Sequence, residues 1–190
     1  MPLLSTRANA SARGYGMFGG AAASLTAYES IATVAGSGQT TISFSSIPST
    51  YKHLQIRVFA STNRGSTANL QLRFNSDTAA NYVKHELVGD GATAAAYATT
   101  GATLISLDRI GGNTTTFGAL VIDILDYADT NKFKTVRNLG GIDSNGSGQV
   151  NLQSGLWRST SAISSLSFIT VDGANTFITN SQFALYGIKG

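Results

Sequence analysis

The stretch Leu70-Gln71-Leu72-Arg73-Phe74-Asn75 alternates apolar and polar side chains at every position. The same period of two recurs in residues 42–45, 54–58 and 165–168, which read ISFS, LQIRV and SLSF. Successive side chains of a strand point to opposite faces of a sheet. The pattern therefore predicts strands that are buried on one face only.

Breaks rich in glycine, asparagine and serine separate these segments, as in Gly89-Asp90-Gly91 and Asn145-Gly146-Ser147-Gly148. Such breaks supply positive φ angles at little steric cost. Strands are predicted between them, near residues 30–35, 40–47, 53–61, 68–75, 82–88, 103–110, 117–126, 133–142, 149–157, 163–171 and 181–188. This spacing predicts an all-β fold, an antiparallel β-sandwich or jelly-roll-like domain over residues 28–190.

Three segments depart from simple alternation. Residues 120–125 are more continuously apolar, which predicts a central strand with both faces covered. Residues 126–132 are predicted to form the one short helix or helical turn of the chain. Residues 92–100 consist largely of alanine and threonine, and they are either a loop or an edge strand.

The composition excludes several classes of protein. Of the 190 residues, 12% are charged, about half the usual share, which disfavours long surface helices. The net charge of +3, without a run of like charges, does not predict a nucleic-acid binder. No apolar stretch approaches the roughly 18 residues of a membrane span. Cysteine is absent, so the chain has neither a disulfide nor a thiolate metal site.

The first 27 residues differ from the rest of the chain. Their alternation is poor, glycine and alanine are frequent, and there is no acidic residue. A segment of this composition is either a disordered tail or an extended arm that becomes ordered against a partner. In the second interpretation, its basic and large apolar side chains contact that partner. These predicted docking residues are Arg7, Arg13, Tyr15, Met17 and Phe18.

Motifs for catalysis and cofactor binding are weak. Gly14-x-Gly16-x-x-Gly19 matches the dinucleotide fingerprint, but no predicted strand precedes it, so no cofactor is expected. His53 lies at the start of a predicted strand. His85 lies next to Lys84 and Glu86 in a strand that also holds Val83 and Leu87, and we predict that it faces away from the core. Neither histidine has a recognisable catalytic partner. No catalytic residue is therefore assigned, and the chain is expected not to be an enzyme.

Acidic and aromatic residues leave two binding alternatives open. Asp143-Ser144-Asn145-Gly146 resembles the start of a calcium loop without its closing glutamate, although ordinary turns use the same residues, and no metal site is assigned. Trp157 is the single tryptophan of the chain. It is either a packing residue or, together with Tyr97 near a strand end, a platform on which a sugar ring stacks.

Several separated blocks resemble a family of small virion structural proteins of tailed bacteriophages. The resemblance covers about residues 27–190. The blocks are YESIATV at 28–34, IPSTYKHLQIR at 47–57, LRFN at 72–75, VIDILDY at 121–127, GLW at 155–157 and FALYGIKG at 183–190. The resemblance implies a place on the virion, without saying which, and it supplies no catalytic residue.

Together these observations favour a capsid decoration (cement) protein that docks on the lattice of the major capsid protein through its N-terminal arm. A homo-oligomer is expected, with a trimer as the favoured arrangement, because sandwich modules often associate with closed symmetry. The alternative is a module of a tail fibre or baseplate that binds glycans of the host surface. A glycan depolymerase is disfavoured, because no acid/base pair is found. Neither nucleic acid nor membrane is expected as a partner.

Overall fold

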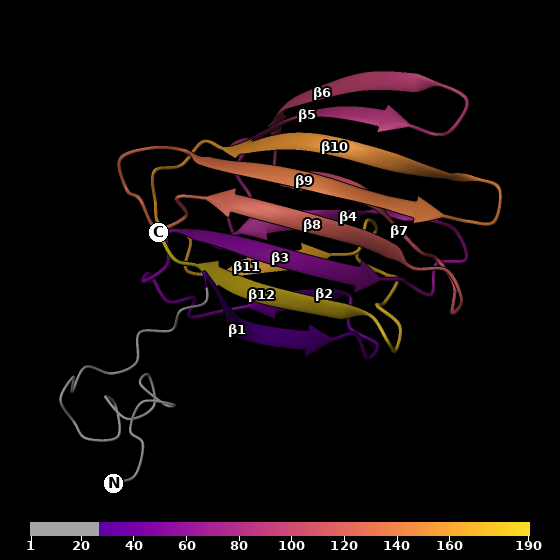
Figure 1. Ribbon diagram of the computed structural model, residues 1–190, viewed down its shortest axis with the longest axis horizontal. Coiled ribbons are helices and arrows are strands. Elements are labelled where there is room, and N and C mark those ends of the chain that lie inside the picture. The colour runs from indigo at the N-terminus through magenta and orange to yellow at the C-terminus, as the bar shows by residue number, and fades with distance from the viewer. Residues whose placement is uncertain (1–26) are drawn as a thin grey trace, which may run out of the picture.

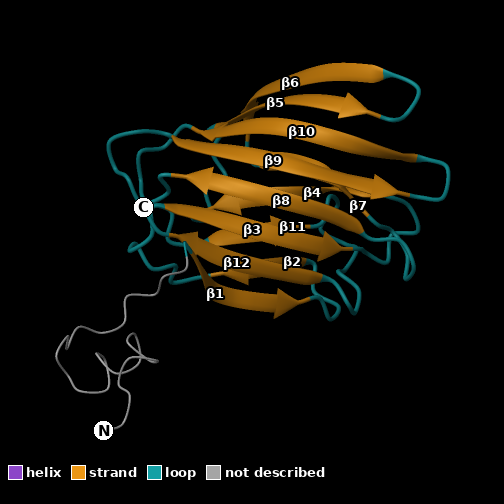
Figure 2. Ribbon diagram, viewed as in Figure 1, coloured by secondary structure: helices purple, strands orange, loops and turns teal. Residues whose placement is uncertain are grey.

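The computed structural model describes residues 27–190, and within that range every regular element is a strand (Figure 2). The strands of the first half are β1 (Tyr28–Ala35), β2 (Thr41–Phe44), β3 (His53–Ala60), β4 (Ala68–Phe74), β5 (Tyr82–Gly89) and β6 (Ala94–Ala102). Those of the second half are β7 (Ile105–Ile110), β8 (Gly118–Leu125), β9 (Lys134–Asp143), β10 (Gly148–Trp157), β11 (Leu166–Ile169) and β12 (Gln182–Ile188).

The strands form two antiparallel sheets that pack face to face (Figure 1). The larger sheet has eight strands in the order β1-β12-β3-β8-β9-β10-β5-β6, and the smaller has four in the order β2-β11-β4-β7. The predicted all-β sandwich is thus confirmed. Because the sheets differ in width, part of the larger sheet extends beyond the smaller one.

The chain wraps between the two sheets as it proceeds. β2, β4, β7 and β11 belong to the smaller sheet, and each is followed by strands of the larger one. This repeated crossing is the connectivity of a jelly roll. The meander β8-β9-β10 widens the larger sheet, with β10 pairing β5 and β5 pairing β6. In the larger sheet, β7 contacts β9 more than any other strand, and β6 lies three positions beyond β9 in the strand order.

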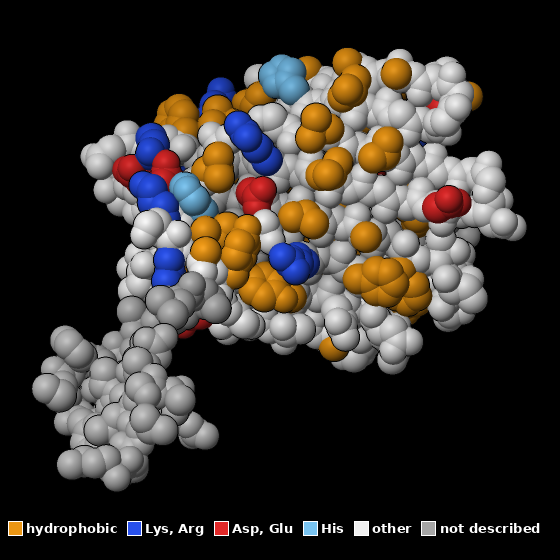
Figure 3. Space-filling model, in the orientation of Figure 1, with side chains coloured by type: hydrophobic (Ala, Val, Ile, Leu, Met, Phe, Trp, Pro, Cys, Tyr) orange, Lys and Arg blue, Asp and Glu red, His pale blue; other side chains and the backbone are white. Residues whose placement is uncertain are grey.

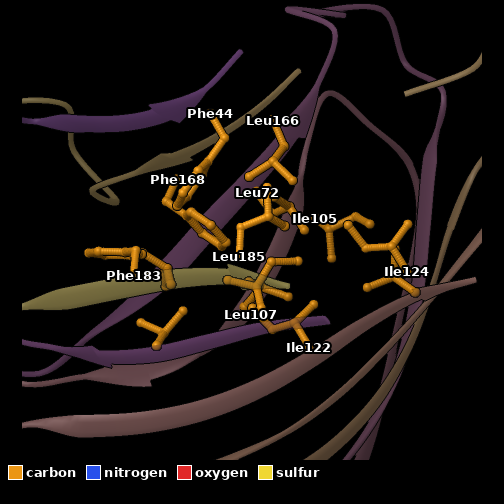
Figure 4. Packing of buried hydrophobic residues seen from close by; sticks show 14 of the residues in the cluster. Phe44, Leu72, Ile105, Leu107, Ile122, Ile124, Leu166, Phe168, Phe183 and Leu185 are labelled. Carbon is orange, nitrogen blue, oxygen red and sulfur yellow. The ribbon is translucent and has the colours of Figure 1, made fainter. Parts of the chain in front are cut away.

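The core lies between the sheets and is built by the predicted alternation. Leu70, Leu72 and Phe74 of β4 are fully buried, whereas the polar residues between them are only partly so. Figure 4 shows side chains from β2, β4, β7 and β11 meeting those of β8 and β12. Phe168 and Phe183, from opposite sheets, have ring centroids 5.1 Å apart. Burial of each such side chain stabilises the fold by roughly 1.5–3 kcal/mol.

Two local predictions need correction. β8 lies between β3 and β9 as a central strand, but only one of its faces is covered, and Val121 on the other face is exposed. The outer face of a two-layer antiparallel sandwich meets solvent.

Residues 126–132 form turns and no helix, since Asp126 has a φ of 49°, outside the right-handed region. The segment Ala92–Thr100 contains most of β6, so of its two alternatives the edge strand is confirmed.

A buried lysine explains the conformation of the turn before β9. The side chain of Lys134 is buried, and its ammonium donates hydrogen bonds to the main-chain carbonyls of Asp129, Lys132 and Thr160. Burial lowers the pKa of Lys134. These carbonyls accept hydrogen bonds from the Lys134 ammonium and not from the main-chain amides that a helix would offer. The turn is therefore wrapped around the lysine side chain.

Candidate functional site

An apolar ladder crosses the outer face of the larger sheet. It consists of Ala96 on β6, Leu87 on β5, Leu152 on β10, Leu139 on β9 and Val121 on β8, and each residue is in register with the next. Leu87, Leu139 and Leu152 are 54%, 56% and 57% exposed. With neighbouring strands about 4.8 Å apart, the ladder is roughly 19 Å long. Single exposed leucines are ordinary, but a contiguous row of them is typical of an interaction surface.

Two shallow hollows border the apolar ladder. One, of about 640 Å³, is lined by residues including Leu87, Ala96 and Leu152. The other, of about 560 Å³, lies over Gly141 and Val150 toward the β9–β10 turn. Next to this second hollow, the exposed Phe59 of β3 extends the apolar surface. Its ring stacks on Phe117, which also lines the hollow, with a centroid distance of 4.7 Å. Figure 3 looks onto this face and shows hydrophobic side chains spread across it, with few charged groups between them.

A row of polar residues runs parallel to the apolar ladder on the same face, two residues away along each strand. It contains His85, Ser154, Arg137, Asp123 and Gln55 on successive strands from β5 to β3. The Gln55 amide donates to the Asp123 carboxylate at 2.9 Å. The outer face therefore combines an apolar strip with a hydrogen-bonding margin, the composition of many protein–protein interfaces.

β6 is a free edge of the larger sheet. Its nine residues, AAAYATTGA, include neither a charged residue nor a proline, and most of them are exposed. Edge strands usually carry charge, proline or bulges that prevent pairing with another chain. β6 has one irregularity in its pairing, near Tyr82 of β5, and otherwise presents an uncharged backbone edge. Such an edge is able to accept an additional strand.

The inner face of β5 is apolar at Tyr82 and Val88 but polar between them. Lys84 and Glu86 point inward and form an ion pair of 2.8 Å. Glu86 also accepts hydrogen bonds from the side-chain amides of Asn151 and Gln153 at 3.2 and 3.3 Å. Nearby, Asp108 accepts from the Gln149 amide at 2.9 Å, and burial raises the pKa of its carboxyl group. Lys84 and Glu86 neutralise each other, as buried charges require, whereas Oδ2 of the buried Asp108 has no hydrogen-bond partner among the described residues.

The structure separates the two aromatic residues predicted to contact glycans. Trp157 is 2% exposed and packs against Phe74 and Tyr82, with centroid distances of 5.6 and 6.4 Å. Its indole N–H donates to Asp77 at 2.7 Å. No sugar ring has access to a residue buried in this way, so Trp157 as a stacking platform is corrected to a core residue. Tyr97, on β6, is 57% exposed.

The remaining predicted residues fall in ordinary structural positions. His53 accepts a hydrogen bond from the main-chain amide of Asp126 at 2.9 Å. His85 faces outward as predicted, but Leu87 shares its face, because residues two apart in a strand point the same way. Asn145 and Gly146 have φ angles of 56° and 93°, the geometry of a two-residue hairpin turn between β9 and β10. Among residues 27–190, no three acidic or histidine side chains are placed to hold a metal ion.

Several predicted features lie outside the described residues. They are the docking residues Arg7, Arg13, Tyr15, Met17 and Phe18 and the glycine motif at 14–19. Conversely, the sequence interpretation missed the apolar ladder. The signal was available in Leu87, Leu139 and Leu152, which are apolar at the outward positions of their strands. It is ambiguous without the structure, since a sequence pattern does not say which face of a strand is covered.

Comparison of the chain with protein-family models, with curated proteins and with solved structures found no match. Within the part of the chain that the structure describes, no helix has the length and apolar character needed to cross a membrane.

Proposed function

We propose that this chain is a non-enzymatic structural protein of a bacteriophage virion, and specifically a capsid decoration protein. The apolar ladder is the observation that carries the proposal. A monomer gains nothing from three leucines in register on its solvent face, whereas a protein that docks on a neighbour buries them. At about 25 cal/mol per Å² of apolar surface, each leucine that becomes fully buried contributes on the order of 1–2 kcal/mol.

Two further features support assembly over catalysis. The low charge of the chain leaves little to repel neighbouring copies, and the uncharged edge of β6 fits strand pairing with a second copy. Pairing of the same edge from two copies gives a twofold dimer, the commonest form of association, in place of the trimer that the sequence analysis favours. The blocks that resemble tailed-phage virion proteins point to the same class of partner. In this proposal, the N-terminal arm adds contacts to the major capsid protein through Arg7, Arg13, Tyr15, Met17 and Phe18.

The apolar ladder is tested by replacing two residues that face each other in register, in the variant Leu87→Ser/Leu152→Ser. Both side chains are exposed, so folding stability should change by less than about 0.5 kcal/mol per site. The readout is the number of copies of full-length chain that bind to particles lacking it. Affinity should fall about tenfold or more, equivalent to at least roughly 1.4 kcal/mol. The matched control is Val171→Ser, an exposed apolar residue just after β11, outside the larger sheet.

Unchanged affinity of the Leu87→Ser/Leu152→Ser variant would refute docking through the apolar ladder. Deletion of residues 2–20 tests the arm in the same assay, and unchanged occupancy would refute its role. Stoichiometry in purified particles separates the two virion locations. A copy number in proportion to the capsid lattice supports decoration, whereas a few copies per particle would support the tail fibre or baseplate alternative.

A further inference from the structure

A polar groove lies on the face of the larger sheet opposite to the apolar ladder, where β5 and β6 extend beyond the smaller sheet. Its volume is about 280 Å³, close to the lower end of small-molecule sites, which span roughly 300–1,000 Å³. One wall comes from β5, β6 and β10 of the larger sheet, and the other from β4 and β7 of the smaller one. Tyr97, Glu86, Asn151, Arg109 and Asp90 are among the residues that line it.

Tyr97 supplies an aromatic surface at this groove. It is in register with Glu86 on β5, so both side chains point to the inner face. On most of that face the smaller sheet covers such side chains, but Tyr97 is 57% exposed. A large aromatic ring left open beside polar groups offers an apolar face to a ligand that also has hydrogen-bonding groups.

The groove also contains polar groups with unused hydrogen-bonding capacity. Asn151 is 2% exposed, and its amide donates to Glu86 while its Oδ1 atom has no hydrogen-bond partner among the described residues. An unpartnered buried acceptor costs roughly 1–3 kcal/mol, so a ligand that donates to it gains affinity. Across the groove, the exposed guanidinium of Arg109 has no carboxylate within 4 Å among residues 27–190. It offers up to five donors.

The charge of the groove suits a neutral ligand. Of its two carboxylates, Glu86 is paired with the ammonium of Lys84, and the charge of Asp90 is opposite to that of the Arg109 guanidinium. Asp90 is fixed in place by the main-chain amides of Ala92 and Thr93 at 3.0 and 2.7 Å. A neutral ligand whose hydroxyl groups both donate and accept matches this mixture of donors and acceptors, and one with an apolar ring face also matches Tyr97.

We propose that this groove binds a neutral sugar, with Tyr97 stacking on the pyranose ring and Glu86, Asn151 and Arg109 bonding its hydroxyl groups. The side chains of the apolar ladder lie on the opposite face of the sheet, although Tyr97 and Glu86, at the sheet edge, also line the hollow beside Leu87 and Ala96. The groove is independent of the proposed function: a decoration protein that docks through its outer face leaves it free. The sugar site replaces the one predicted around Trp157.

The test measures binding of free glucose, galactose, mannose and N-acetylglucosamine to the full-length chain by saturation-transfer NMR, with titration of any sugar that binds. At least one sugar should bind with a dissociation constant near the millimolar range. Such weak affinity is expected for one sugar ring held by a few hydrogen bonds and one stacking contact. Tyr97→Ser should weaken that binding about tenfold or more. Because Tyr97 is exposed, the variant should retain the parent's melting temperature.

The matched control is the Leu87→Ser/Leu152→Ser variant, which changes the other face of the same strands. It should bind sugar as the parent does while losing particle binding, and Tyr97→Ser should show the reverse pattern. Absence of binding by all four sugars, or equal binding by the Tyr97→Ser variant, would overturn the inference. Binding restricted to sialylated or sulfated sugars in a parallel titration would also overturn it, because the groove would then select for negative charge.

Discussion

Replacement of Trp157 by alanine should destabilise the fold severely, because the indole is a core element. It is 2% exposed, packs on Phe74 and Tyr82, and donates to Asp77 at 2.7 Å. Truncation of a buried tryptophan to alanine costs roughly 3–5 kcal/mol through lost burial and the cavity left behind. For a domain of this size, 1 kcal/mol corresponds to roughly 2–4 °C, so the melting temperature should fall by about 6–20 °C.

Trp157→Phe separates packing from hydrogen bonding. Phenylalanine keeps much of the contact with Phe74 and Tyr82 but loses the bond to the Asp77 carboxylate, which is worth roughly 1.5–3 kcal/mol when one partner is charged. Asp77 keeps hydrogen bonds from Asn81 and from the main-chain amide of Ala79, so it stays partly satisfied. The Phe variant should therefore lie between the parent and the Ala variant in stability.

The assay is thermal unfolding of the full-length chain, followed by circular dichroism and, in the parent, by fluorescence of its single tryptophan. Tyr97→Ser serves as the control for loss of an exposed aromatic residue, and its melting temperature should match that of the parent. A Trp157→Ala variant that melts within about 2 °C of the parent would refute the reasoning, because that corresponds to no more than about 1 kcal/mol. Such a result would also reopen Trp157 as a surface residue.

Three further predictions concern buried and charged groups. Hydrogen bonds from Lys132 and Lys52 lower the pKa of Asp126 to about 2 from its ordinary 3.8, so its stabilising contribution is present above pH 3.8 and lost as the pH falls toward 2. Asp126→Asn should flatten the decline of melting temperature over that window, and an unchanged decline would contradict the ion pairs. Burial raises the pKa of Asp108, so its ionised form opposes folding at neutral pH. Asp108→Asn should raise the melting temperature at pH 7, and the increase should become smaller as the pH falls. A lower melting temperature of the variant at pH 7 would contradict the raised pKa. Lys134→Met leaves three main-chain carbonyls without their donor, and urea unfolding should show a loss of about 1–3 kcal/mol or more. Unchanged stability would mean that water satisfies those carbonyls.

The sequence alone determined the fold class and much of the strand pattern. Alternation in residues such as Leu70, Leu72 and Phe74 reflects a local constraint, since a strand with one covered face must place apolar side chains at every second position. Turn residues are likewise local, and Asn145-Gly146 forms the hairpin turn that its sequence favours. These features depend on residues that are close in the sequence, so they can be predicted without the tertiary structure.

Only the tertiary structure decided which face of β5 is buried. One face carries Val83, His85 and Leu87, and the other carries Tyr82, Lys84, Glu86 and Val88, so the local pattern does not choose between them. Pairing with β10 places Glu86 beside the amides of Asn151 and Gln153, which lie about 65 residues away in the chain and stabilise its charge between the sheets. Leu87 is thereby turned outward into the apolar ladder, and Tyr97 inward to the groove. Both candidate sites follow from this long-range pairing, because burial of a charge is set by partners that no local pattern of the strand contains.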